Sequence, residues 1–124
     1  MSKLLVDSSC WIELFTGGKR ASACEKRIKR TTSILVPTLV IYEVYKKIAT
    51  KVGEAQSLSA VGYLSQNQVL LLDRATSLYA ADLSIELGLP MADSIILAHS
   101  RIERAELMTL DDDFLGIDGV NVLR

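Results

Sequence analysis

Residues 4–9 read Leu-Leu-Val-Asp-Ser-Ser, a short apolar run that ends on an acid and two serines. An uninterrupted apolar run of this length is typical of a strand buried on both faces of a parallel sheet. Ser9 is a suitable N-cap for the amphipathic segment that follows it. We therefore expect a strand that opens directly into a helix, and we expect Gly17 and Gly18 to end that helix.

The same alternation of apolar runs and helical patterns continues along the chain. Further strands are expected at residues 33–36, 69–72, 106–109 and 119–123, and helices at 19–31, 38–52, 54–66, 75–87 and 92–104. Short strands that alternate with helices predict an α/β fold with a mainly parallel central sheet. No repeat or linker interrupts the pattern, so we expect one domain over residues 1–124.

The composition is that of an ordinary globular protein. Of 124 residues, 49% are hydrophobic and 23% charged, and 14 basic against 15 acidic side chains leave a formal charge of -1. General disorder is excluded, and nucleic-acid binding would need a local basic patch. Two cysteines are too few for a disulfide scaffold, and no apolar run approaches the ~18 residues of a membrane span. We expect a cytoplasmic protein that does not bind membranes.

Acids gather where the predicted strands end. Asp7 follows the first strand, Asp73 follows the third, and Asp111, Asp112 and Asp113 follow the fourth. In parallel sheets the functional site lies beyond these carboxyl ends, and carboxylates held close together repel unless a cation intervenes. One histidine and two isolated cysteines make no zinc site, whereas carboxylates suit Mg²⁺ or Mn²⁺.

Four segments resemble the motifs of the PIN-domain family, in the family's order. They are Leu5-Val6-Asp7-Ser8-Ser9, Val40-Ile41-Tyr42-Glu43-Val44, Leu89-Pro90-Met91-Ala92-Asp93-Ser94-Ile95-Ile96-Leu97-Ala98 and Met108-Thr109-Leu110-Asp111-Asp112-Asp113-Phe114. Each motif is common alone, but the four together over nearly the whole chain are fairly specific. The resemblance implies a three-layer sandwich with helices on both faces of the sheet, and a Mg²⁺-dependent ribonuclease. Stand-alone members of this size are mostly VapC-type toxins of toxin–antitoxin pairs.

The resemblance also implies roles for individual residues. The acidic quartet, expected to be catalytic, is Asp7, Glu43, Asp93 and Asp111. The expected metal ligands are Asp7, Asp93, Asp111 and Asp113. Ser9 and Thr109 match small polar positions that hydrogen-bond near the metal. The implied partners are an RNA substrate, a small VapB-like antitoxin and a second copy of the chain.

Several of these residues also have ordinary structural interpretations. Asp7 and Ser9 fit a helix cap, and Glu43 lies within reach of Lys46 and Lys47 for an exposed ion pair. Three other residues are interpreted as packing in the core or at a subunit contact: Trp11, Tyr42 and His99.

The predicted helix at residues 19–31 carries a basic face. Ala21, Cys24 and Ile28 form its apolar stripe, and six cations against one acid occupy the other half. Such a face is a candidate phosphate-binding surface. The expected RNA contacts are Lys19, Lys26, Arg27 and Arg30, and the next candidates are Lys46, Lys47 and Lys51.

Two other functions remain open from the sequence. A phospho-receiver signalling domain has the same size and class, with Asp73 as its phosphoacceptor and Asp7 as a metal ligand. Against it, Ser8 follows Asp7 where receivers usually have a second acid, and acids stand at 111–113 where they have a lysine. The second alternative is a PIN-like module that binds RNA or protein without cleaving RNA, and the retained acidic quartet argues against it.

Overall fold

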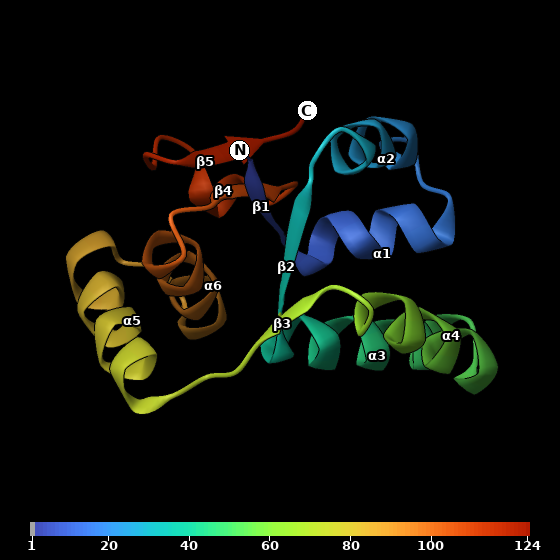
Figure 1. Cartoon of the computed structure of the whole chain (residues 1–124), viewed down its shortest axis with the longest axis horizontal. Coiled ribbons are helices and arrows are strands. Elements are labelled where there is room, and N and C mark those ends of the chain that lie inside the picture. The colour runs from blue at the N-terminus through green and yellow to red at the C-terminus, as the bar shows by residue number, and fades with distance from the viewer. Residues whose placement is uncertain (1) are drawn as a thin grey trace.

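The computed structural model describes residues 2–124, with a parallel sheet at its centre (Figure 1). The strands are β1 (Lys3–Val6), β2 (Ser33–Pro37), β3 (Gln68–Leu70), β4 (Glu106–Thr109) and β5 (Val120–Val122). Their order across the sheet is β3-β2-β1-β4-β5, and each neighbouring pair is parallel. The prediction of an α/β fold with a mainly parallel sheet is confirmed.

Helices cover both faces of this sheet. They are α1 (Ser8–Thr16), α2 (Ala21–Lys29), α3 (Thr38–Lys51), α4 (Glu54–Leu64), α5 (Arg74–Leu87), α6 (Met91–Ile102) and the short 3-10 helix η1 (Asp112–Phe114). Figure 1 shows α5 and α6 on one side of the sheet and α1 to α4 on the other, which gives the expected three layers. Each helix within residues 2–124 is too short or too polar to cross a membrane.

The core lies between the sheet and its two helical layers. Leu4, Leu5 and Val6 of β1 are completely buried, because a central strand is covered on both faces. Trp11 is also completely buried, and its ring centroid lies 5.7 Å from that of Phe15. The prediction that Trp11 packs in the core is confirmed.

Two predictions about packing and capping differ from the structure. Tyr42 is 59% exposed, so its interpretation as a core residue is wrong, while a subunit contact at Tyr42 stays a prediction. The cap of α1 is Asp7, not Ser9, because the Asp7 carboxylate accepts a hydrogen bond from the Ser8 N–H at 2.8 Å. The predicted end of α1 is confirmed, since Gly17 has the left-handed φ of 69° that favours glycine.

The third strand is shorter than the apolar run that predicted it. β3 ends at Leu70, and Leu71 and Leu72 are 73% and 43% exposed. β3 pairs only with β2, so it forms an edge of the sheet and its end has no second neighbour to cover it. Apolarity alone therefore overestimated this strand.

The strand order contradicts the phospho-receiver alternative. Receiver-type sheets have the order 2-1-3-4-5, which places the third strand beside the first. Here β3 lies at the edge, and β2 separates it from β1. Asp73 is exposed and caps α5 by accepting a hydrogen bond from the Thr76 N–H at 2.8 Å. The interpretation of Asp73 as a phosphoacceptor is wrong.

Candidate metal centre

The candidate site forms where β1 and β4 end, at the middle of the sheet. In this pair Val6 lies opposite Met108, so the next residues along the two strands, Asp7 and Thr109, lie side by side. From β1 the chain adds β2 and β3 on one side of the sheet and then β4 and β5 on the other side. The strand order therefore reverses between β1 and β4. Open α/β sheets bind ligands in the crevice at such a point.

Asp7 is a buried carboxylate whose two oxygens are both hydrogen-bonded. Oδ1 accepts from the Ser8 N–H at 2.8 Å, and Oδ2 accepts from the hydroxyls of Thr109 at 2.7 Å and Ser9 at 3.1 Å. Burial raises the pKa of Asp7, the hydrogen bonds lower it in part, and the negative charge of Asp111 raises it further. These contacts hold the carboxylate in one orientation.

Ser9 and Thr109 join the two segments that carry the acids. Their hydroxyl oxygens lie 3.3 Å apart. The Ser9 hydroxyl accepts a hydrogen bond from the Leu110 N–H at 3.0 Å, and the Thr109 hydroxyl accepts one from the Asp111 N–H at 3.0 Å. The start of α1 is thereby tied to the loop after β4. Whether these hydroxyls also act near a metal stays a prediction.

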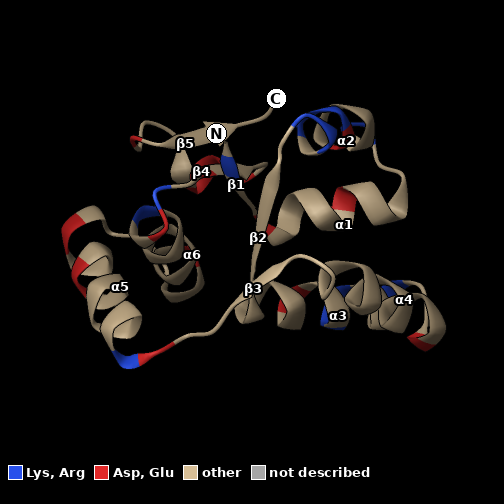
Figure 2. Ribbon diagram, in the orientation of Figure 1, with Lys and Arg blue, Asp and Glu red and all other residues tan. Residues whose placement is uncertain are grey.

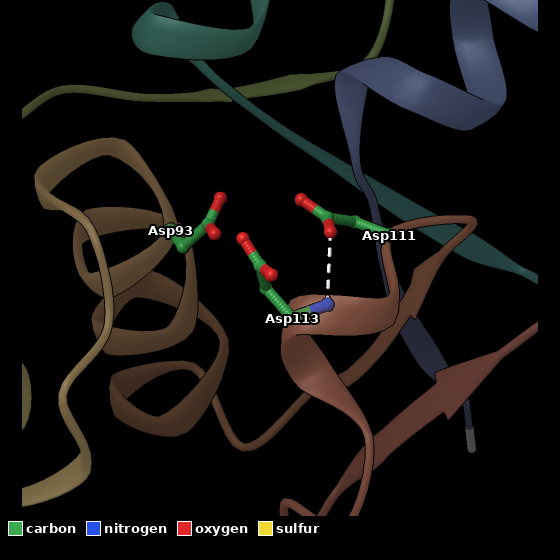
Figure 3. A group of neighbouring side chains, drawn as sticks. All are labelled: Asp93, Asp111 and Asp113. Atoms are coloured by element: carbon green, nitrogen blue, oxygen red, sulfur yellow. Dashed lines mark hydrogen bonds between the residues drawn. The ribbon is translucent and has the colours of Figure 1, made fainter.

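Three carboxylates point toward one another beside this network (Figure 3). Asp93 comes from the first turn of α6, and Asp111 and Asp113 come from the segment that forms η1. One oxygen from each carboxylate lies within 4.8 Å of the other two. Asp111 also accepts a hydrogen bond from the Asp113 N–H at 2.9 Å, which fixes their relative position.

The surroundings of the Asp93 carboxyl change its acidity strongly. Its burial raises the pKa first, and the negative charges of Asp111, Asp7, Asp113 and Glu43 raise it further, to about 7. A carboxyl in such surroundings is poised to lose its proton near neutral pH when a cation approaches. The five acids named here therefore act on one another electrostatically.

Glu43 reaches the same region from α3. It is half-buried, and its pKa is raised by burial and by the charge of Asp7, while a hydrogen bond with the Ser8 side chain lowers it. Within residues 2–124 it forms no ion pair with Lys46 or Lys47. The interpretation of Glu43 as half of an exposed ion pair is therefore wrong, and its carboxylate belongs beside the acids.

The donor set suits a hard divalent cation. All its donors are carboxylate oxygens, which Mg²⁺ and Mn²⁺ prefer. In the part of the chain that the structure describes, no ion pair involves any of the five acids, so a bound cation would relieve their mutual repulsion. Of the predicted ligands, the structure groups Asp93, Asp111 and Asp113. Asp7 lies outside that group, and both of its oxygens accept hydrogen bonds from residues other than these three acids.

Asp112 differs from its two neighbours in the run of acids. Its carboxylate lies 3.4 Å from the guanidinium of Arg124, and both side chains are well exposed. It takes no part in the group of three acids. This agrees with the roles that the resemblance implies, which include Asp111 and Asp113 but not Asp112.

The basic face of α2 lies away from the acids. Arg27 forms an ion pair at 2.6 Å with Glu106, the first residue of β4, whereas Asp111 follows the other end of that strand. Arg27 therefore lies toward the amino ends of the strands and is already paired. The other predicted RNA contacts make no ion pair within residues 2–124; they are Lys19, Lys26 and Arg30.

A groove of about 380 Å³ that includes Glu43 was not predicted from the sequence, although Lys46 and Lys47 were candidate RNA contacts. It lies on α3 and is lined by Tyr42, Glu43, Lys46, Lys47 and Thr50. The available signal was helical spacing, since positions 42, 46 and 50 recur every four residues and share one face. The assumption that Tyr42 packs in the core concealed that signal.

Comparison with known proteins gives a consistent result. The model of the PIN domain family matches residues 4–120. The chain is similar to a toxin–antitoxin complex from Klebsiella pneumoniae, with 25% identity over 96% of each chain and a TM-score of 0.83. Its fold also matches VapBC2 from Rickettsia felis bound to a promoter DNA fragment (16% identity, 98% of this chain and 97% of that chain, TM-score 0.76).

A third similar fold is that of VapC20 from Mycobacterium tuberculosis, described as a toxin that cleaves the sarcin–ricin loop. The two chains share 18% identity over 90% of this chain and 92% of that one, with a TM-score of 0.76. No sequence among the curated proteins matches this chain. The similarities span nearly the whole described structure, including the strands and helices that carry the acids.

Proposed function

This chain belongs to the PIN domain family, and from that premise we propose that it is a metal-dependent endoribonuclease, the toxin of a VapBC-type toxin–antitoxin pair. The observation that carries the proposal is the convergence of Asp93, Asp111 and Asp113 at the strand ends, beside Asp7. The similarity to a toxin–antitoxin complex supports the toxin assignment. The similarity to a toxin that cleaves an RNA loop supports RNA as the substrate.

Mg²⁺ or Mn²⁺ would be held by Asp93, Asp111 and Asp113, and the charge of Asp7 would add to the attraction for the cation. When bound, such an ion acidifies water and neutralises charge on a phosphate oxygen. The hydrogen bond from the Asp113 N–H orients the Asp111 carboxylate, and the Thr109 hydroxyl connects Asp111 to Asp7. These contacts keep the carboxylates in place before any ligand arrives.

Glu43 is suited to a different task from the other acids. It lies outside the group formed by Asp93, Asp111 and Asp113, it comes from a different helix, and burial raises the pKa of its carboxyl. A carboxylate with a raised pKa accepts a proton more readily near neutral pH. We propose that Glu43 holds and releases a proton at the reacting phosphate, while the aspartates hold the cation.

We further propose that residues 1–124 act as a single domain in the cytoplasm. Partners would be a small VapB-like antitoxin, whose tail enters or covers the acidic site, and a second copy of this chain. The neighbours named as toxin–antitoxin complexes support the antitoxin. Co-expression with the small open reading frame next to this gene, followed by co-purification, tests the antitoxin. Light scattering tests the homodimer.

The decisive experiment pairs two neighbouring acids. We expect purified protein to cleave RNA with Mg²⁺ or Mn²⁺, and EDTA to abolish the cleavage. Asp111→Asn should lose both cleavage and Mn²⁺ binding measured by calorimetry. Asp112→Asn should keep both, because Asp112 is exposed and pairs only with Arg124. Full cleavage by Asp111→Asn, or cleavage that persists in EDTA, would contradict the proposal, and RNA binding without cleavage would favour the non-catalytic alternative.

A further inference from the structure

The groove on α3 combines an exposed aromatic ring with two cations. Tyr42 is 59% exposed, although Val40 and Val44 on the same helix are completely buried. The Lys46 ammonium lies 5.7 Å from the centroid of the Tyr42 ring, within the range of a cation–π contact. The ring is thus held by the lysine and remains open to a planar ligand.

The cations of this groove are not neutralised by the protein. Lys46 and Lys47 are exposed, and neither forms an ion pair with any acid within residues 2–124. Thr50 extends the lining one turn further along the helix with a hydroxyl group. Two free ammonium groups beside an open ring form a surface that attracts an aromatic polyanion.

Glu43 connects this groove to the acid cluster. It lines the groove, and its charge also acts on the carboxyl of Asp93, while the charge of Asp7 acts on Glu43 itself. A chain molecule lying in the groove would therefore contact Glu43, whose charge acts on the acid cluster. Basic segments occur on both α2 and α3 (Figure 2), but only those of α3 adjoin an acid of the cluster.

We propose that the α3 groove, lined by Tyr42, Lys46, Lys47 and Thr50, binds single-stranded RNA next to the bond to be cleaved. One unpaired base stacks on Tyr42, and the adjoining phosphates lie against Lys46 and Lys47. Stacking platforms flanked by cations bind single strands with little dependence on sequence, because each base has a stacking face. A base inside a duplex is already stacked and cannot use the ring. This inference rests on the proposed ribonuclease function.

Binding is measured in the Asp111→Asn background, so that the RNA stays intact. The probe is a fluorescently labelled, unstructured oligoribonucleotide, followed by anisotropy at several salt concentrations. Lys46→Glu with Lys47→Glu should weaken binding at least tenfold. It should also lower the slope of log K against log salt by about 1.4, since each single-strand phosphate contact contributes about 0.7. The milder pair Lys46→Gln with Lys47→Gln should act in the same direction if the charge reversal impairs folding.

The aromatic contribution is tested separately. Tyr42→Ala should weaken binding about fivefold or more with an unchanged salt slope, and Tyr42→Phe should restore it, because stacking needs the ring and not the hydroxyl. The matched charge control is Arg74→Glu with Arg104→Glu, at two exposed positions at the start of α5 and just after α6, on the other side of the sheet. This control should bind RNA as the parent does.

The competing surface is α2, tested by Lys26→Glu with Arg30→Glu. Loss of binding in that pair, with parent affinity in the Lys46 and Lys47 pair, would overturn the inference. The inference also fails, and the ribonuclease function stands, if the active protein cleaves RNA and the groove variants cleave it with unchanged kcat/KM. If the parent protein neither binds nor cleaves RNA, the proposed function fails and the inference fails with it.

Discussion

Asp7 and Asp73 occupy equivalent places in the local pattern of the chain. Each follows a short apolar strand, and each carboxylate caps the helix that begins there through a backbone N–H at 2.8 Å. Their surroundings differ: Asp7 is 6% exposed, and burial raises its pKa, whereas Asp73 is exposed and hydrogen bonds with Thr76 lower its pKa.

Strand order explains the difference between the two aspartates. β1 is central, and its neighbour β4 brings Thr109 and Asp111 against Asp7. β3 is at the edge, and its one neighbour, β2, ends on Pro37, which offers no acid. In this sheet, Asp7 meets other acids because a second acid-bearing strand end lies beside it, and Asp73 has no such neighbour.

The largest expected effect comes from exchanging each carboxylate for its amide. Asp7→Asn should lower RNA cleavage on the order of 10³-fold while the protein still folds, because the amide is nearly isosteric but neutral. Asp73→Asn should keep cleavage within about twofold, since its oxygen still accepts the capping hydrogen bond. Cleavage rates and circular dichroism of both variants test this, and an active Asp7→Asn protein would remove Asp7 from the catalytic set.

The next effect concerns pH and needs no substrate. The folded pKa of Asp93, about 7, lies above its ordinary value near 3.8, so the folded state holds the proton more tightly than the unfolded state. The stability that this proton contributes is present below about pH 4 and is lost as the pH rises through about 7. Melting temperatures in EDTA between pH 4 and 8 should decline accordingly.

Asp93→Asn provides the control for that pH dependence. The amide does not titrate, so the decline should be smaller and the variant should melt higher than the parent at pH 8 in EDTA. Added Mn²⁺ should raise the melting temperature of the parent and have little effect on the variant. Equal slopes in both proteins would show that Asp93 is not the titrating group.

A smaller effect is expected from the hydroxyl that supports Asp7. Thr109→Val keeps the shape of a completely buried side chain but removes its hydrogen bonds to Asp7 and Asp111. Urea unfolding should show a loss of about 1–3 kcal/mol, the usual cost of leaving buried polar groups unpaired. Thr109→Ser retains the hydroxyl and should stay closer to the parent. If Thr109→Val matches the parent in stability, these hydrogen bonds do not support the site.

The smallest effect is expected at the edge strand. Asp73→Ala removes the cap of α5 and should lower the melting temperature by a few degrees. Cleavage measured well below that temperature should be unchanged. A large loss of activity in this variant would contradict the comparison, because it would show that Asp73 also contributes to the site.

Much of the fold and of the candidate site was predictable because the signals are local. The apolar run at residues 4–6, the glycines after α1 and α5 and the acids after the strands are readable within a few positions. The predictions were wrong where burial depends on distant segments. Leu71 and Leu72 are as apolar as the residues of β1, but they follow an edge strand and remain exposed. The exposure of Tyr42 and the ion pair of Arg27 with Glu106 could not be predicted from the sequence for the same reason, since both depend on residues far along the chain.

The sequence by itself determined the alternation of strands and helices and the carboxylates at the strand ends, because periodicity and capping act between near neighbours. The local pattern alone does not separate Asp7 from Asp73, and it was the resemblance to the PIN-domain family that named Asp7 and Glu43. The tertiary structure supplied the physical reason, because β4 brings Thr109 and Asp111 to Asp7 while β3 lies at the edge of the sheet. Only the tertiary structure showed that Tyr42, Lys46 and Lys47 are exposed. The physical reason is that burial, charge and hydrogen bonding at a site come from distant segments, as when Thr109 donates to Asp7 across 102 positions of the chain.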